Sequence, residues 1–285
     1  MPLPAGSRLK PFIVQRLDQL NKAKARRSLG QIQGKIGEMP MTRGFQGALA
    51  AAFNRTGVPS IIAELKGGSP FDPALRTMVP YKALAEDFEA VGAAGLSVAV
   101  ERQVFRGSYS DLATVRGAVD LPLLARDIIF DVYQILEARL AGADAVVLSA
   151  GLLGAQLGEF RERAASIALD ALVEVHTPAE VEAARAAGAD FLCVTNRNIH
   201  TFELKPGTCE ELLPLIPAGA AFVVADGGLG SAEDRARLGT AGAKALLIGT
   251  ALMKDADPAG VLEQVMGVET MGVETMGAEA DAEEG

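Results

Sequence analysis

Short apolar runs recur along the chain from residue 58 onward, separated by Ala/Leu/Glu/Arg-rich segments of helical periodicity. Eight such runs are present: Ile61–Ala63, Leu96–Val100, Leu121–Leu124, Ala145–Leu148, Ala171–Val175, Phe191–Val194, Ala221–Ala225 and Ala245–Ile248. Strands that are apolar along their whole length are typical of a parallel sheet covered by helices. Eight strand–helix units in about 200 residues predict an α/β protein, a closed (β/α)8 TIM barrel.

An open, doubly wound parallel sheet is the alternative fold for alternating strands and helices. Its phosphate-binding signature, Gly-x-Gly-x-x-Gly, does not follow the first predicted strand. The barrel is therefore favoured. Gly-Ala-Asp at 142–144 and 188–190 predicts helix ends, because glycine suits the left-handed C-terminal position. Barrel enzymes carry their chemistry at the carboxyl ends of the strands, so polar residues there are the site candidates.

The residues before the first strand predict extra N-terminal helices. Leu9, Ile13, Leu17 and Leu20 are spaced four, four and three, which makes one apolar helical stripe. Residues 1–50 carry nine basic and two acidic side chains, a net +7 within a chain of −9. A basic amphipathic helix can bind polyanions or membranes, but we expect it to dock on the barrel with its charges in water. We therefore expect a helical extension at 1–50 and the barrel at 51–265.

The C-terminal end is a short acidic repeat. Residues 266–285 read MGVET-MGVET-MGAEADAEEG and hold six acidic and no basic side chains. A five-residue period matches neither helix nor strand, and the composition is typical of a disordered tail. Without these six charges, −9 − (−6) leaves −3 for the rest of the chain.

Several classes of function are disfavoured by composition. The acidic net charge argues against a nucleic-acid partner, no stretch of 18 residues is apolar throughout, and no secretory signal opens the chain. We thus expect a cytoplasmic protein without a membrane partner, either monomer or homodimer. Cys193 and Cys209 exclude a disulfide scaffold, and with His176 and His200 they make no metal-ligand set. No cofactor motif is present, so neither a metal nor a cofactor is expected.

The first predicted strand ends in a charged pair. Glu64 and Lys66 are two residues apart and face the same side, which is the interior of a barrel. Such charges pair with each other or serve a ligand, because an unpaired buried charge is costly. The following Gly67-Gly68-Ser69 offers backbone N–H groups and a hydroxyl that suit a phosphate or carboxylate.

Polar residues also end the later strands. Arg126, at the end of the third strand, is either a rim cation for a ligand or a salt-bridge partner of Asp127. Glu174 lies in the apolar run of the fifth strand, where burial would raise its pKa, as suits a general acid. Arg197 can grip a carboxylate bidentately. Glycines after strands seven and eight of such barrels often bind phosphate; here these positions hold Asp226, Gly227, Gly228, Gly249 and Thr250. Together these residues suit a small sugar phosphate that also carries a carboxylate.

At these residues the sequence resembles the indole-3-glycerol phosphate synthase family, from about residue 9 to 265. The matching stretches are Ile62-Ala-Glu-Leu-Lys-x-x-Ser-Pro, Arg126-Asp127 with Tyr133-Gln134-Ile135, Leu172-Val-Glu-Val-His176, and Asn196-Arg197 with Thr201-Phe202. The resemblance implies a tryptophan-biosynthesis barrel that closes a pyrrole ring on carboxyphenylamino-deoxyribulose phosphate. Carbon dioxide and water leave, and no cofactor is used.

The resemblance also implies roles by position. Lys66 and Ser69 would lie beside the phosphate and the ring-closing chemistry, and Glu64 would support dehydration. Glu174 would be the acid/base carboxylate, and Arg197 would hold the anthranilate carboxylate. Further substrate contacts and phosphate-binding positions would be Phe105, Ile128, Thr195, Asp226, Gly227, Gly228, Gly249 and Thr250.

Five strand-end positions depart from the family pattern. The family's general-acid lysine is Arg126, which keeps its proton and stabilises an oxyanion rather than donating. The other departures are Ile128 for phenylalanine, Thr195 for asparagine, Asp226-Gly227-Gly228 for Glu-Ser-Gly, and Ser69-Pro70-Phe71 for Ser-Pro-Ser. Such changes indicate an altered substrate or a lost step.

Three hypotheses stay open from the sequence. The first is a working or divergent synthase acting on the usual substrate or a close analogue in a specialised pathway. If only its proton donor is missing, lysine at position 126 should raise activity. The second is a catalytically silent homologue that binds a phosphorylated ligand or a partner. The third is another phosphosugar barrel, such as an isomerase, although Glu64-x-Lys66 lacks the aspartate that an Asp pair at strands one and seven would need.

Overall fold

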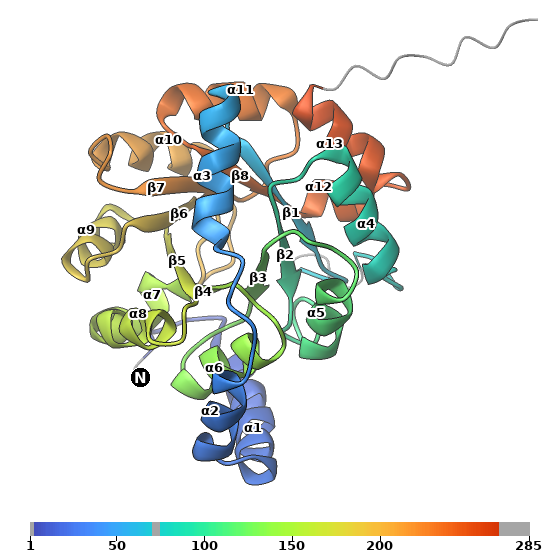
Figure 1. The fold of residues 1–285 in the computed structure, drawn as a ribbon. Helices are drawn as coiled ribbons and strands as arrows, with labels where there is room; N and C mark the ends of the chain where they lie inside the picture. Colours follow the sequence, from blue (N-terminus) through green and yellow to red (C-terminus); the bar gives the residue numbers. More distant parts are fainter. Residues whose placement is uncertain (1–2, 70–74, 268–285) are drawn as a thin grey trace, which may run out of the picture.

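The eight predicted strands pair side by side into a closed barrel, β1 to β8 in chain order (Figure 1). In this computed structural model, residues 3–69 and 75–267 are described. Every neighbouring pair is parallel, including β8 with β1. The strands are β1 Ser60–Leu65, β2 Gly95–Ala99, β3 Leu123–Arg126, β4 Ala145–Ser149, β5 Asp170–Val175, β6 Phe191–Thr195, β7 Phe222–Asp226 and β8 Ala245–Ile248. The TIM-barrel prediction is confirmed.

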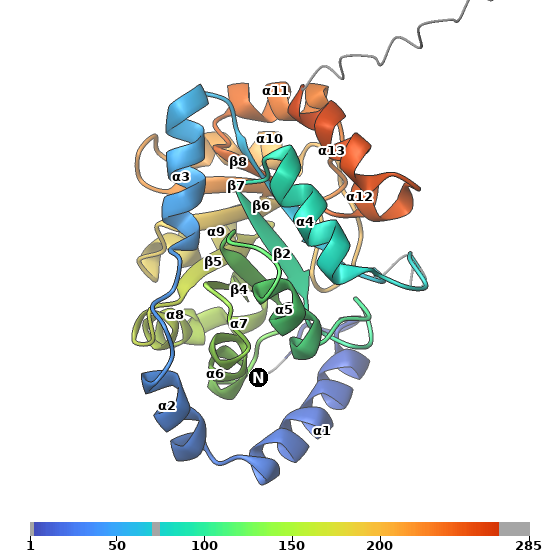
Figure 2. The same cartoon turned by 45° about the vertical axis from the view of Figure 1, so that its right-hand side comes forward.

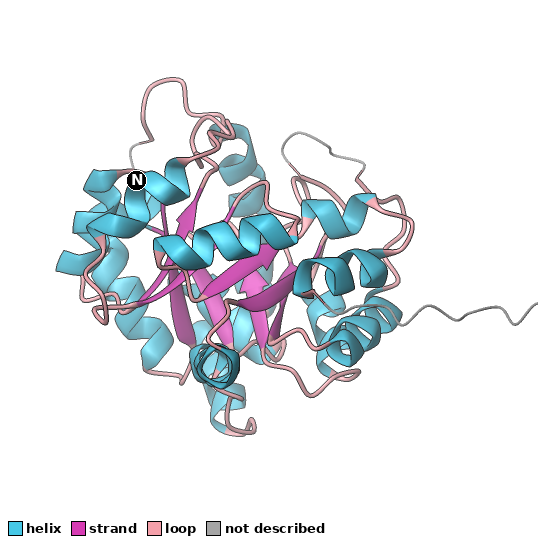
Figure 3. Cartoon of the chain, turned by 90° about the horizontal axis from the view of Figure 1, so that it is seen from above, coloured by secondary structure: helices cyan, strands magenta, loops and turns pink. Residues whose placement is uncertain are grey.

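Helices surround the strands, as seen from above in Figure 3. Those that follow the barrel strands are α4 Tyr81–Val91, α5 Tyr109–Arg116, α6 Val132–Leu140, α7 Ala150–Leu153, α8 Leu157–Ala165, α9 Pro178–Ala186, α10 Thr208–Leu212, α11 Ala232–Ala241, α12 Thr250–Lys254 and α13 Pro258–Met266. Gly142 and Gly188 adopt positive φ angles of 97° and 73° after their helices, as the Gly-Ala-Asp pattern predicts. None of the helices in the described ranges is long and apolar enough to cross a membrane.

Three helices precede the barrel: α1 Lys10–Arg26, α2 Leu29–Gly37 and α3 Phe45–Thr56. Helix α3 closes one end of the barrel, where Phe45 and Leu49 pack with inward-facing strand residues such as Ile62 and Phe191. The domain boundary expected between residues 50 and 51 falls inside this helix. Helices α1 and α2 both contact α6, and Figure 2 shows the two helices below the barrel. The predicted acidic tail lies outside the described residues beyond Gly267.

The apolar stripe of α1 is only partly buried. Leu20 is fully buried and so is Leu9, just before the helix, but Leu17 is 45% exposed. The expectation that the basic side chains of this helix lie in water is wrong for Arg16, which is 5% exposed and forms a salt bridge with Asp127. A helix charge can be buried when a carboxylate of the barrel compensates it.

Candidate active site

Arg126 lies at the centre of a charged cluster at the carboxyl ends of the strands. Its Nη2 atom is 2.9 Å from Asp226 Oδ2 and 3.2 Å from Glu174 Oε2, and its Nε atom is 3.3 Å from Glu64 Oε1. These carboxylates come from β7, β5 and β1, so one guanidinium ties three strands together. The alternative that Arg126 pairs with Asp127 is wrong, because adjacent residues of a strand point to opposite sides.

The predicted Glu64–Lys66 pair forms at the end of β1. Lys66 Nζ lies 2.5 Å from Glu64 Oε2, and the hydroxyl of Ser97 on β2 donates to Glu64 Oε1 at 3.3 Å. Both Glu64 and Lys66 are buried. Because Glu64 also faces Arg126, it is held between two cations as a permanent carboxylate.

The two buried glutamates differ in their protonation. Burial raises the pKa of Glu174 to about 7, although Arg126 opposes that shift. Burial also works to raise the pKa of Glu64, but Lys66 and Arg126 outweigh it and hold that pKa below its ordinary value. For Arg126, burial would lower the pKa, and Asp226, Glu64 and Glu174 outweigh it and raise the pKa well above its usual range. Glu174 is thus the member of this cluster suited to exchange a proton near neutral pH.

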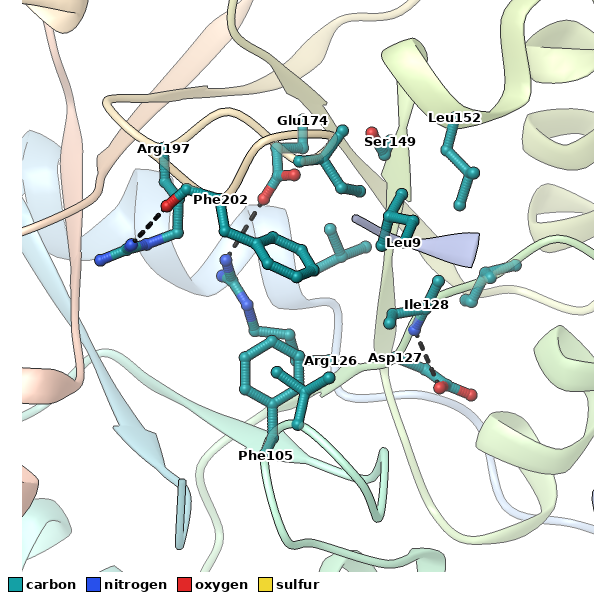
Figure 4. A pocket seen from close by; sticks show the side chains of 14 residues that line it. Leu9, Phe105, Arg126, Asp127, Ile128, Ser149, Leu152, Glu174, Arg197 and Phe202 are labelled. Atoms are coloured by element: carbon teal, nitrogen blue, oxygen red, sulfur yellow. Dashed lines mark hydrogen bonds and ion pairs between the residues drawn. The ribbon is translucent and has the colours of Figure 1, made fainter. Parts of the chain in front are cut away.

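An apolar chamber lies on one side of this cluster (Figure 4). Its walls include Phe105 and Ile128, and Glu174, Arg126 and Arg197 supply polar edges. Asp127 and residues that the sequence analysis did not select complete the lining: Leu9, Val104, Ile129, Val147, Ser149, Leu152, Ile199 and Phe202. The apolar walls and charged edges of this chamber suit an aromatic ring with a charged substituent.

A second, more polar chamber lies on the other side. It is lined by Lys66, Ser69, Phe105, Arg126, Arg197, Asp226, Gly227, Gly228, Leu229, Leu247, Gly249 and Thr250. Gly249 lies against the charged pair of β1: a Cβ atom there would overlap Glu64 Oε2 and come within 2.9 Å of Glu64 Cβ and 3.0 Å of Lys66 Nζ. Position 249 therefore needs glycine, because any side chain there would overlap the Glu64–Lys66 pair.

We expect Gly249→Ala to lower kcat/KM by about tenfold, because the added methyl group displaces the Glu64–Lys66 pair. The measurement is steady-state kinetics beside a thermal melt. Gly242→Ala is not a suitable control because of its positive φ angle, whereas Gly158 has open space around its Cβ position and an ordinary φ. Gly158→Ala should therefore leave kcat/KM unchanged. Equal kinetics for the two variants would contradict the prediction.

Two backbone assignments made from the sequence need correction. The N–H groups of Gly67 and Gly68 do not point to a ligand, because they donate to the carbonyl oxygen of Phe105 at 2.9 and 3.0 Å. The N–H group of Gly227 donates to Asp226 Oδ1 at 2.6 Å. The Gly-Gly-Ser loop therefore contributes the side chain of Ser69 to the polar chamber and anchors the loop after β2.

The remaining candidates have local partners. The hydroxyl of Thr195 accepts a hydrogen bond from the backbone N–H of Arg197 at 3.1 Å, and Thr195 is not among the residues that line either chamber. Arg197 Nη1 donates to the carbonyl oxygen of Phe202 at 3.0 Å. His176 Nδ1 contacts the Thr195 carbonyl, and His200 bridges Ser7 and Gly151. Among the described residues, no group of three or more His, Cys, Asp or Glu side chains could hold a metal ion.

Sequence reasoning missed the contribution of the N-terminal extension to this site. Leu9 is fully buried and packs with Val104, Ile128, Leu152 and Phe202 around the apolar chamber. The only signal in the sequence was its place at the start of the apolar stripe. Phe202 lay within a matched motif, but nothing in the motif showed that its ring faces the chamber.

Comparisons with known proteins agree with these features. A family model for indole-3-glycerol phosphate synthase matches residues 9–265. The indole-3-glycerol phosphate synthase of Nocardioides sp. is 42% identical over 212 residues, covering 74% of this chain and 81% of that protein. That of Laribacter hongkongensis is 33% identical over 255 residues, covering 89% and 97%. A solved thiamine phosphate pyrophosphorylase from Pyrococcus furiosus aligns with a TM-score of 0.55 and 17% identity over 75% of this chain and 96% of that one, which shows a shared fold alone.

Proposed function

The chain belongs to the indole-3-glycerol phosphate synthase family, and we propose that it carries out the ring closure associated with that family. The substrate would be carboxyphenylamino-deoxyribulose phosphate or a close analogue. In this reaction a ring carbon bonds to the keto carbon of the sugar chain, the carboxylate leaves as carbon dioxide, and a hydroxyl leaves as water. The family implies a carboxy-lyase of tryptophan biosynthesis.

One observation carries this proposal: the two chambers meet at Phe105, Arg126 and Arg197, which line both. An aromatic ring in the apolar chamber and a phosphate in the polar chamber would place the carbons between them beside Arg126 and Glu174. Fixing both ends of the molecule in this way would hold its two reacting carbons in an orientation that favours ring closure.

The charged cluster supports a division of roles. Arg126 keeps its proton, so we assign it to the developing oxyanion of the keto group. Its Nη1 atom is buried and has no hydrogen-bond partner among the described residues, which leaves one donor for a ligand oxygen. Glu174 then gives the proton to the keto oxygen as the ring closes. The Glu64–Lys66 pair would assist loss of the hydroxyl as water.

The decisive test is formation of indole-glycerol phosphate by the purified chain, followed by absorbance and mass spectrometry. We expect turnover, with carbon dioxide and water as co-products. The competing proposal of a silent homologue is favoured by one feature: Nε and Nη2 of Arg126 are paired with three carboxylates of the protein itself. Binding of the saturating substrate without turnover would support that proposal and exclude the synthase reaction.

Arg197→Met is expected to raise KM about tenfold while kcat falls by less than about threefold, because loss of a charged hydrogen bond to a bound carboxylate costs roughly 1.5 kcal/mol or more. The measurement is steady-state kinetics with the same substrate. Arg161, a partly exposed arginine on α8, is a suitable control, and Arg161→Met should leave KM unchanged. A purely kcat effect of Arg197→Met would contradict its binding role.

A further inference from the structure

The end of β3, which carries Arg126, is paired with a neighbouring strand on one side only. On one side, β3 pairs with β2 up to Arg126, which lies opposite Ala99. On the other side its register with β4 stops one residue earlier, at Ala125 opposite Val146. The backbone at Arg126 therefore lacks a ladder partner on the β4 side. A contact from outside the sheet can therefore support the backbone at this strand end.

The side chain of Asp127 supplies that support. Its Oδ2 atom accepts hydrogen bonds from Arg16 Nη2 at 2.8 Å, from Tyr109 Oη at 3.0 Å and from Gln134 Nε2 at 3.0 Å. Its Oδ1 atom accepts from Arg16 Nε at 3.3 Å and from the N–H of Ile128 at 2.8 Å. The donors come from α1, α5 and α6, so three helices converge on the residue next to Arg126.

We propose that Arg16 of the N-terminal extension, acting through Asp127, positions Arg126 and Ile128 for the reaction. This inference rests on the proposed function. Arg126 and Asp127 point to opposite sides of the strand end. Holding the carboxylate of Asp127 in place on one side therefore fixes the guanidinium of Arg126 on the other, together with Ile128 of the chamber wall. Arg16 is a positioning residue, since it lines neither chamber.

The burial of this pair makes it sensitive to truncation. The side chains of Arg16 and Asp127 are 6% and 1% exposed. Removing one partner of a buried pair leaves the other charge uncompensated, and the structure then relaxes around it. Here that relaxation would move the strand end that carries Arg126. A shift of about 1 Å in a reacting group can cost about a hundredfold in rate.

The experiment compares Arg16→Met with Lys24→Met. Lys24 lies on the same helix and also joins α1 to the start of α6, through a 2.6 Å ion pair with Asp131, but this pair is partly exposed and Lys24 is not among the donors to Asp127. We expect Arg16→Met to lower kcat about thirtyfold and to raise KM by no more than about tenfold. Arg16→Lys should recover part of the loss, and Lys24→Met should keep kcat within twofold. Equal kcat values for Arg16→Met and Lys24→Met, measured on folded protein, would overturn the proposal.

Tyr109→Phe covers the case in which Arg16→Met does not fold. It removes one donor to Asp127 and keeps the ring, and we expect kcat to fall about fivefold. An unchanged kcat would count against the proposal.

If the unmodified chain has no turnover, the proposed function fails and the positioning role is measured by binding. Anthranilate, followed by its own fluorescence, is the probe of the apolar chamber. Arg16→Met should then weaken its Kd about tenfold, because Ile128 and Arg126 move, and Lys24→Met should not. An equal Kd in both variants would overturn the inference on its own.

Discussion

Glu174→Gln is expected to lower kcat by about a thousandfold, with KM changed by less than about threefold. Glutamine keeps the size of the side chain and can still hydrogen-bond to Arg126, but it cannot donate a proton to the keto oxygen. The measurement is steady-state formation of indole-glycerol phosphate. The matched control is Glu159→Gln on α8, since this glutamate lies away from both chambers. A loss of less than tenfold would remove Glu174 from proton transfer.

The pH dependence of kcat distinguishes a general acid from a general base at Glu174. The pKa of Glu174 is raised to about 7, so its protonated form is the one present below that pH. A general acid acts in this form, and kcat should therefore fall as pH rises through about 7. A general base would give the opposite slope. The pH–rate profile of the unmodified chain distinguishes the two.

The raised pKa of Glu174 also makes the free energy of unfolding depend on pH. A raised pKa in the folded state means that the native protein binds this proton more tightly than the unfolded chain does. The stabilisation is complete below the ordinary pKa of a glutamate and is lost as pH rises through about 7. Urea unfolding of the unmodified chain and of Glu174→Gln over this range should show a smaller pH slope in the variant. Equal slopes would contradict the assignment of that pKa to Glu174.

The fold could be predicted because its determinants are local. Each strand is a short apolar run, and each glycine that ends a helix stands in the sequence beside the run that follows. The charged residues at the strand ends could be predicted as well, because alternation along a strand assigns Glu64 and Lys66 to the interior. Glu174 and Arg197 were selected from their places on the fifth strand and after the sixth strand, and the resemblance then implied their roles.

The partners of these residues could not be predicted, because they are distant in sequence and chosen by packing. Asp127 pairs with Arg16, 111 positions away, rather than with its neighbour Arg126. Gly67 and Gly68 donate to the Phe105 carbonyl because the loops after β1 and β2 meet at the rim. Neither choice follows from periodicity or composition. Both depend on which polar groups remain unpaired once the barrel has closed.

Arginine at position 126 and aspartate at position 226 form a compensated pair. Relative to the pattern of the family that the sequence resembles, the cation is longer and the carboxylate is shorter, so the two changes oppose each other in length. The two side chains meet at 2.9 Å. The fork of the guanidinium also contacts Glu64 through Nε and Glu174 through Nη2, so the carboxylates are met by separate nitrogen atoms. We therefore interpret the two substitutions as one change in the site.

Arg126→Lys is consequently expected to lower kcat/KM about a hundredfold rather than to raise it. The ammonium group loses contact with at least one of the three carboxylates and leaves it buried without a partner. Asp226→Glu alone should cost about tenfold, since the longer side chain meets the intact guanidinium. The double variant should recover to within about fivefold of the unmodified chain, because residues that share one network are not additive. Steady-state kinetics of the four proteins tests this cycle. If Arg126→Lys alone raises activity, then the chain lacks only a proton donor, and Arg126 has no specific function of its own in the site.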